Sequence, residues 1–180
     1  MSGIRDGKTC FEINNIRAYI DRLARNVVQY LIDEKLSLSA AESCTGGLLS
    51  SAITSVSGSS KIFECGVVSY SEKIKEELLG VPSETIDKYG VVSAETAIAM
   101  AEAVKELSKS DIAVGITGLA GPAGAEDILP VGTIYISIAY GDRKIAENLK
   151  LYELGGFDRE VNRLLTVALA LEKVLEILKS

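Results

Sequence analysis

The sequence predicts a single three-layer α/β/α domain, built on a mainly parallel five-stranded sheet with an antiparallel hairpin at one edge. Strand-like and helix-like segments alternate along much of the chain, as in domains whose helices pack on a mostly parallel sheet. The last two strand-like segments are joined only by residues 140–143, a length typical of a hairpin, so one edge of the sheet should be antiparallel. No internal repeat or Pro/Gly-rich linker divides the 180 residues, which favours one domain.

The periodicity of the apolar residues defines the individual elements. Residues 1–11 are polar, and we expect them to form a flexible leader before a domain spanning residues 12–180. A long amphipathic helix follows, because Ile16, Ile20 and Val27 stand with other apolar residues three or four positions apart. The five predicted strands are residues 36–42, 63–70, 112–117, 131–139 and 144–151. The other predicted helices are residues 47–56, 72–79, 82–89, 93–107 and 158–178.

Composition narrows the functional classes. The chain carries a formal net charge of −6 and has 47% hydrophobic and 24% charged residues, which is typical of a globular protein. No basic stripe gathers the 19 Lys and Arg residues, so we expect no nucleic-acid partner. No apolar run approaches the roughly 18 residues of a membrane span, and the start of the chain lacks a signal-peptide core, so we expect a cytoplasmic protein without a membrane partner.

Cysteine and histidine usage restricts the chemistry further. Three cysteines at irregular spacing, without a CxxC pair, argue against a disulfide framework or a structural zinc site. We therefore expect no metal and no cofactor. The chain contains no histidine, so a hydrolytic reaction would have to use another general base.

A first candidate loop, residues 41–47, joins a predicted strand to a predicted helix. It contains Ser43, Cys44 and Thr45, followed by Gly46 and Gly47. Such a junction presents a side chain at the carboxyl end of a strand and exposes backbone N–H groups at a helix start. It can hold a nucleophile beside an anion-binding site, although an N-capped helix with closely packed glycines is an equal alternative.

A second candidate loop follows the next predicted strand. If Tyr70 ends that strand, Lys75 lies early in the next helix and both side chains can face the first loop. A lysine with a destabilised charge can act as the base for a serine. The alternative is that Lys73 and Lys75 are solvent-facing charges, as most lysines are.

A third candidate loop, residues 115–124, holds four glycines and a proline, and Pro130-Val-Gly-Thr133 follows it. It matches neither a phosphate-binding loop ending in Gly-Lys-Ser/Thr nor a dinucleotide-binding fingerprint. Backbone N–H groups in such a loop can surround a phosphate or a carbonyl, although a structural turn is the commoner explanation.

Together these motifs identify a family resemblance. The chain resembles the C-terminal domain of CinA, the competence/damage-inducible protein, and its stand-alone relatives that deamidate nicotinamide mononucleotide. The resemblance extends from about residue 36 to the last helix. It is carried by the ordered set of residues 41–47, 66–71 with Lys75, 90–93, 117–122 and 130–133.

The resemblance implies an amidohydrolase that converts nicotinamide mononucleotide to nicotinic acid mononucleotide and ammonia. Ser43 would be the nucleophile, and Tyr70 and Lys75 would activate it and carry its proton. From the chemistry of the loop, we expect the oxyanion to lie against backbone N–H groups near Thr45 and Gly46.

The resemblance also implies where the rest of the substrate would bind. Thr117 corresponds to the hydroxyl residue of the third motif. An arginine that begins the last helix corresponds best to Arg159, with Arg163 one turn later as the alternative. We expect Arg159 and the amides of the glycine loop, including Gly118 and Gly121, to hold the 5′-phosphate.

The sequence differs from the family pattern at three places that bear on the substrate. Glu72 stands where an asparagine is usual, Ala125 replaces a glycine, and Leu129 replaces a lysine. Two alternatives to an amidohydrolase stay open: a non-catalytic nucleotide-sensing or partner-binding module, and thiol chemistry at Cys44. The long first and last helices carry ample apolar surface, so we also expect a homo-oligomer.

Overall fold

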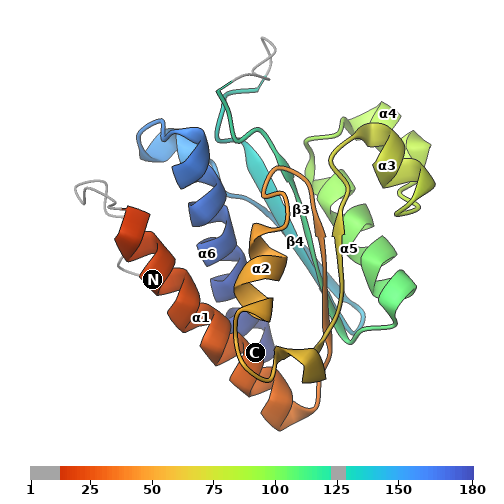
Figure 1. The fold of residues 1–180 in the computed structure, drawn as a ribbon. Helices are drawn as coiled ribbons and strands as arrows, with labels where there is room; N and C mark the ends of the chain where they lie inside the picture. Colours follow the sequence, from red (N-terminus) through yellow and green to blue (C-terminus); the bar gives the residue numbers. More distant parts are fainter. Residues whose placement is uncertain (1–12, 123–128) are drawn as a thin grey trace.

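The computed structural model describes residues 13–122 and 129–180 and forms one mixed sheet with helices on both faces (Figure 1). The strands are β1 (Leu38–Glu42), β2 (Phe63–Val68), β3 (Ile112–Gly118), β4 (Ile134–Tyr140) and β5 (Arg143–Asn148), in the spatial order β2-β1-β3-β4-β5. The α-helices are α1 (Ile13–Glu34), α2 (Leu48–Thr54), α3 (Glu72–Glu77), α4 (Ser83–Tyr89), α5 (Ala94–Ser108) and α6 (Arg159–Leu178). The leader expected at residues 1–11 lies outside the described residues.

The helices form two outer layers, as predicted. In Figure 1, α1, α2 and α6 lie on one side of the sheet, and α3, α4 and α5 lie on the other. The strand side chains follow this division because they alternate between faces. Leu38 and Ala40 of β1 belong to the core beneath α1 and α6, whereas Ala41 belongs to the core beneath α5.

The sheet combines parallel and antiparallel pairing. β1 pairs in parallel with both β2 and β3, while β4 pairs antiparallel with β3 and with β5. Four of the five strands therefore run in one direction, and the expected hairpin at the β5 edge is confirmed, with a two-residue turn in which Gly141 has a φ of 57°. The sequence did not predict that β3 and β4 also pair antiparallel.

Several element ends differ from the expected ones. β2 ends at Val68 rather than at residue 70, because Ser71 accepts a hydrogen bond from the Ile74 N–H and caps α3. β5 ends at Asn148 rather than at residue 151, and a 3₁₀ turn, Leu151–Leu154, follows it. Among the described residues, no helix is long and apolar enough to cross a membrane.

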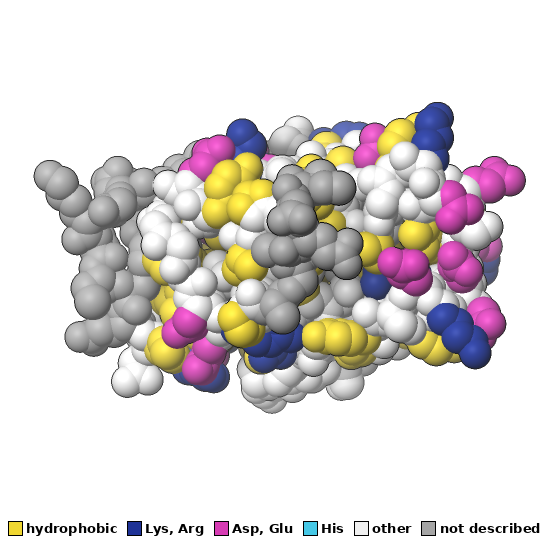
Figure 2. Space-filling model, turned by 90° about the horizontal axis from the view of Figure 1, so that it is seen from above, with side chains coloured by type: hydrophobic (Ala, Val, Ile, Leu, Met, Phe, Trp, Pro, Cys, Tyr) yellow, Lys and Arg dark blue, Asp and Glu magenta, His cyan; other side chains and the backbone are white. Residues whose placement is uncertain are grey.

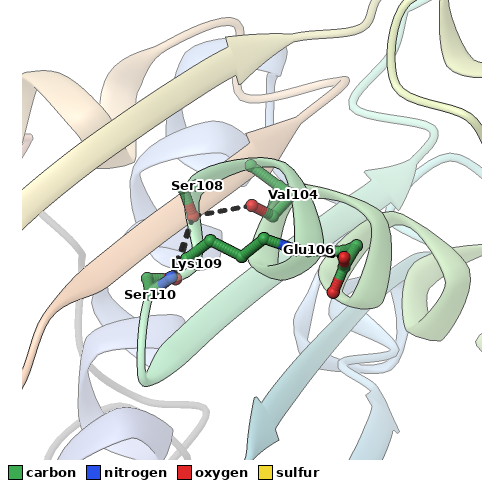
Figure 3. Close-up of polar contacts among 5 residues, drawn as sticks. All are labelled: Val104, Glu106, Ser108, Lys109 and Ser110. Atoms are coloured by element: carbon green, nitrogen blue, oxygen red, sulfur yellow. Dashed lines mark hydrogen bonds and ion pairs between the residues drawn. The ribbon is translucent and has the colours of Figure 1, made fainter.

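Serine hydroxyls fix the end of the sheet remote from the candidate loops. At the end of α5, the Ser108 hydroxyl donates to the Val104 carbonyl at 2.7 Å and contacts the Ser110 hydroxyl, while Lys109 pairs with Glu106 (Figure 3). Ser110 in turn lies 2.7 Å from the hydroxyl of Ser39 in β1, in a fully buried contact. This polar cluster ties the start of β1 to the α5–β3 connection.

Candidate active site

A cavity of about 500 Å³ lies where β1, β2 and β3 end. Ligands of open α/β sheets commonly bind at this edge. Its walls come from all three candidate loops and from the segment before α5. The lining residues are Ser43, Cys44, Tyr70, Ser71, Glu72, Lys73, Lys75, Val91, Val92, Thr117, Gly118, Leu119, Ala120, Gly121 and Arg159.

Ser43 and Lys75 form a buried pair in this cavity. The Lys75 side-chain nitrogen Nζ lies 3.1 Å from Ser43 Oγ and donates to the Ser69 carbonyl at 2.7 Å. The exposed fraction of Lys75 is 1% and that of Ser43 is 8%. The alternative of a solvent-facing Lys75 is therefore wrong, whereas Lys73 does face solvent.

The environment of Lys75 shifts its protonation equilibrium toward the neutral form. Burial lowers the pKa of the Lys75 amine below its ordinary value, and the nearby Cys44 and Glu72 side chains partly oppose this shift. No carboxylate in the described part of the chain forms an ion pair with Lys75. A neutral amine within hydrogen-bonding distance of a serine hydroxyl can accept the hydroxyl proton.

Tyr70 occupies a different position from the one expected for a proton carrier. Its side chain is 61% exposed, and its hydroxyl accepts a hydrogen bond at 2.8 Å from Arg159 Nη2. It makes no hydrogen bond to Ser43 or Lys75. In this structure Tyr70 holds Arg159, whose other terminal nitrogen donates to the Gly121 carbonyl at 2.6 Å.

The oxyanion was expected beside Thr45 and Gly46, but neither residue lines the cavity. Thr45 is completely buried and outside the cavity lining, and the Gly46 N–H donates to the Ser43 carbonyl at 3.0 Å. The helix start that follows them is also occupied. Glu42, fully buried at the end of β1, accepts hydrogen bonds from the N–H groups of Gly47, Leu49 and Ser50. An anion already fills the place expected for a ligand.

The third loop supplies the available donors instead. Thr117, Gly118 and Gly121 line the cavity as expected, and the Thr117 hydroxyl donates to the Val91 carbonyl at 2.7 Å. The backbone N–H groups of Ala120 and Gly121 have no acceptor among the residues that the structure describes. These amides can serve an oxyanion or a phosphate.

The two arginines near the start of α6 have separate tasks. Arg159 lines the cavity, whereas Arg163 lies outside the lining and donates to the Thr45 carbonyl at 2.7 Å. Arg163 therefore stabilises the first loop through the backbone carbonyl of Thr45. Of the two, Arg159 alone is placed to reach a bound molecule.

Cys44 is placed as a small core side chain rather than as a nucleophile. It is 5% exposed, and burial raises the pKa of its thiol to about 12. A thiol is a good nucleophile only as the thiolate, so the structure argues against thiol chemistry at this residue.

Two of the three departures from the family pattern lie among the residues that the structure describes. Glu72 lines the cavity, and Leu129 lies outside its lining. Ala125 lies outside the described residues.

Sequence reasoning missed Glu42 and the carbonyl of Ser69. The available signal for Glu42 was an acidic residue at the end of an otherwise apolar and small strand, directly before a serine. A buried carboxylate needs several donors, and the helix start five residues later provides them. The role of the Ser69 carbonyl could not be predicted, because every residue has a backbone carbonyl and the residue type gives no signal.

Comparison with known proteins gives the family. The profile described as the CinA C-terminal domain matches residues 20–178. A CinA-like protein of Prochlorococcus marinus is 44% identical over 144 residues, which are 80% of this chain and 33% of the relative. The chain spans about a third of the length of the curated relatives that it matches.

Solved structures share the fold over nearly their whole length. The competence/damage inducible protein CihA from Agrobacterium tumefaciens superposes with a TM-score of 0.84 at 36% identity, covering 90% of this chain and 96% of that one. A CinA superfamily protein from Escherichia coli gives a TM-score of 0.82 at 31% identity, covering 88% of this chain and 90% of that one. With matching motifs, profile and architecture, this chain belongs to the CinA C-terminal domain family.

Proposed function

We propose that the protein is a metal-independent serine amidohydrolase that converts nicotinamide mononucleotide to nicotinic acid mononucleotide and ammonia. The observation that carries the proposal is the buried contact of 3.1 Å between Lys75 Nζ and Ser43 Oγ. Burial without an ion-pair partner gives Lys75 the lowered pKa that a serine-activating base needs. The choice of nucleotide follows from the motif resemblance, and the cavity volume suits a ligand of that size.

The reaction can be written with these two side chains. As Ser43 Oγ attacks the carboxamide carbon, its proton passes to Lys75 Nζ. Lys75 then donates that proton to the amide nitrogen and the C–N bond breaks. Ammonia departs, and the acyl group remains on Ser43 as an ester. Water attacks the ester while Lys75 accepts its proton, and the return of a proton to Ser43 Oγ releases the carboxylic acid.

The cavity wall at Arg159 is the proposed phosphate site. Arg159 is a permanent cation, and Tyr70 and Gly121 hold it at the rim beside the loop amides. On the α3 side the cavity is lined by Glu72, Lys73 and Lys75. Seen from above, acidic and basic side chains both lie over the part of the molecule formed by α3 and α4 (Figure 2). We expect the phosphate at Arg159, the charged residue of the lining that lies at the start of α6.

The test is to incubate the purified protein with nicotinamide mononucleotide and to measure both ammonia and nicotinic acid mononucleotide. We expect the two products in equal amounts. Binding of the nucleotide without product would instead place the protein in the sensor class. If the nucleotide is neither bound nor converted, it is excluded as the substrate.

Replacing Arg159 with alanine should raise KM for nicotinamide mononucleotide about 10- to 100-fold, because a charge-assisted hydrogen bond contributes about 1.5–3 kcal/mol. The measurement is steady-state kinetics, with nicotinamide riboside, which lacks the phosphate, as the second substrate. Arg163→Ala is the matched control, since this arginine lies outside the cavity lining. Equal losses on both substrates would contradict a phosphate contact.

The rate should rise with pH as Lys75 loses its proton. Because burial lowers the pKa of Lys75, the acidic limb of kcat/KM should have its midpoint below the ordinary lysine value. The charge of Glu72 raises the pKa of Lys75, so Glu72→Gln should move this limb to lower pH. A pH profile of both proteins checks this, and a limb that stays in place in the variant would contradict the assignment.

A further inference from the structure

Glu42 stands directly before the proposed nucleophile and has no role in the reaction as written above. Its side chain is completely buried, and each carboxylate oxygen accepts two hydrogen bonds. Oε2 accepts from the N–H groups of Gly47 and Leu49, both at 3.1 Å. Oε1 accepts from the N–H of Ser50 at 2.8 Å and from its hydroxyl at 2.7 Å.

Ser43 lies in the turn between β1 and α2, and these contacts fix both ends of that turn. Glu42 shares the α2-facing side of β1 with Leu38 and Ala40, so its carboxylate reaches the start of α2. Gly47, the N-cap residue of α2, has no side chain that could cap the helix. One side chain therefore joins the end of the strand to the start of the helix and fixes the short turn between them.

The backbone of Glu42 extends the same connection to the lysine. Its carbonyl accepts from the Ser69 N–H at 2.9 Å, and the Ser69 carbonyl accepts from Lys75 Nζ at 2.7 Å. The two members of the Ser43–Lys75 pair are thus held by hydrogen bonds that meet at one residue. A glycine in β2 leaves room for this arrangement, since a Cβ on Gly66 would lie 2.6 Å from Ser50 Oγ.

A carboxylate is a costly choice for a buried position. Transfer of its charge out of water is unfavourable, and an apolar side chain would pack there without that cost. In the described part of the chain no lysine or arginine forms an ion pair with Glu42, so backbone donors and one hydroxyl carry the whole compensation. Such a fully satisfied group restricts geometry strongly, because any displacement leaves donors unpaired.

We infer that Glu42 is a positioning residue, whose buried carboxylate sets the distance and direction between Ser43 Oγ and Lys75 Nζ. The inference rests on Ser43 being the nucleophile of the proposed function. Glu42 is not among the residues that line the cavity, so it is not placed to contact a bound substrate. Its loss should therefore lower kcat and the intrinsic reactivity of Ser43 while leaving KM nearly unchanged.

The test compares Glu42→Gln with Ser39→Ala. The amide nitrogen of the glutamine cannot accept, so at least one backbone N–H at the start of α2 loses its partner. Ser39→Ala removes a buried hydrogen bond on the same strand but near the polar cluster at its other end, so it controls for a general loss of stability. The readouts are kcat, KM, thermal stability, and the rate at which phenylmethanesulfonyl fluoride sulfonylates Ser43 with loss of fluoride.

We expect Glu42→Gln to lower kcat and the sulfonylation rate by at least 10-fold, with Ser39→Ala retaining both within 2-fold at a similar loss of stability. Equal effects of the two variants on kcat and sulfonylation would overturn the inference. If Glu42→Gln does not fold, Ser50→Ala decides, because it keeps the carboxylate and removes one of its four bonds. A selective loss of sulfonylation in that variant supports the inference, and an unchanged rate refutes it.

The sulfonylation assay also separates this inference from the proposed function. Labelling of Ser43 needs no nucleotide. A wild-type protein that is labelled but does not hydrolyse nicotinamide mononucleotide would contradict the proposed substrate and still test Glu42. A protein that is neither labelled nor active would overturn both.

Discussion

Replacing Ser43 with alanine is expected to lower kcat for nicotinamide mononucleotide by about 10⁴-fold or more, because nucleophiles of serine hydrolases show losses of this order when removed. The neighbouring thiol is not expected to replace the hydroxyl. Cys44 is adjacent, but burial raises the pKa of its thiol to about 12 and keeps it protonated. The loss should therefore appear in kcat, since binding of the nucleotide at Arg159 and the third loop needs no Ser43 hydroxyl.

Three measurements are needed for this variant: turnover by ammonia release, affinity for the nucleotide by calorimetry, and the free energy of unfolding. We expect affinity within a few-fold of wild type and a loss of stability of about 1 kcal/mol, from the single hydrogen bond with Lys75. Cys44→Ala is the matched control and should retain activity. Appreciable turnover by Ser43→Ala would exclude the serine mechanism, and inactivity confined to Cys44→Ala would reinstate the thiol.

Replacing Lys75 with methionine should lower kcat by about 10²- to 10⁴-fold, the usual contribution of a positioned general base. Methionine has a similar length and suits a site where only 1% of the side chain is exposed. The variant should remain folded, because a buried amine is exchanged for an apolar group while two acceptors lose a donor. We expect its stability at neutral pH to lie within about 2 kcal/mol of wild type.

The pH dependence of unfolding distinguishes the lost base from a damaged fold. In wild type, the unfolded chain binds a proton that the folded chain has released, between the lowered pKa of Lys75 and the ordinary lysine value. The free energy of unfolding should therefore rise with pH through this window, and Lys75→Met should lack that rise. A variant that keeps the rise, or that keeps full activity, would show that Lys75 is charged or dispensable.

Much of the fold could be predicted from local sequence patterns. The apolar periodicity of α1 and α6 and the short turn between β4 and β5 are properties of neighbouring residues. Their conformational preferences act over a few positions, so they can be identified in the sequence. Strand order and the antiparallel pairing of β3 with β4 depend on contacts across the whole chain, and they were not predicted.

The same distinction between local patterns and contacts across the chain applies to the candidate site. The turns after the predicted strands, at the ligand-binding edge of such sheets, pointed to Ser43 and Lys75, whereas Thr117 and Arg159 were expected from the family resemblance. Whether Lys75 was a solvated charge or a buried base was undetermined, since burial depends on how α3 packs over the strand ends. In the folded chain Lys75 is buried, with Nζ 3.1 Å from Ser43 Oγ; its role as a base stays part of the proposal.

The sequence by itself determined the α/β architecture, the three loops at one edge of the sheet, and the residue types available for chemistry. Only the tertiary structure decided which of these residues meet. It placed the Tyr70 hydroxyl against Arg159, the Glu42 carboxylate at the start of α2, and Thr45 and Gly46 outside the cavity lining. The physical reason is that backbone donors and buried charges must be satisfied wherever the fold places them, and those partners come from distant parts of the chain.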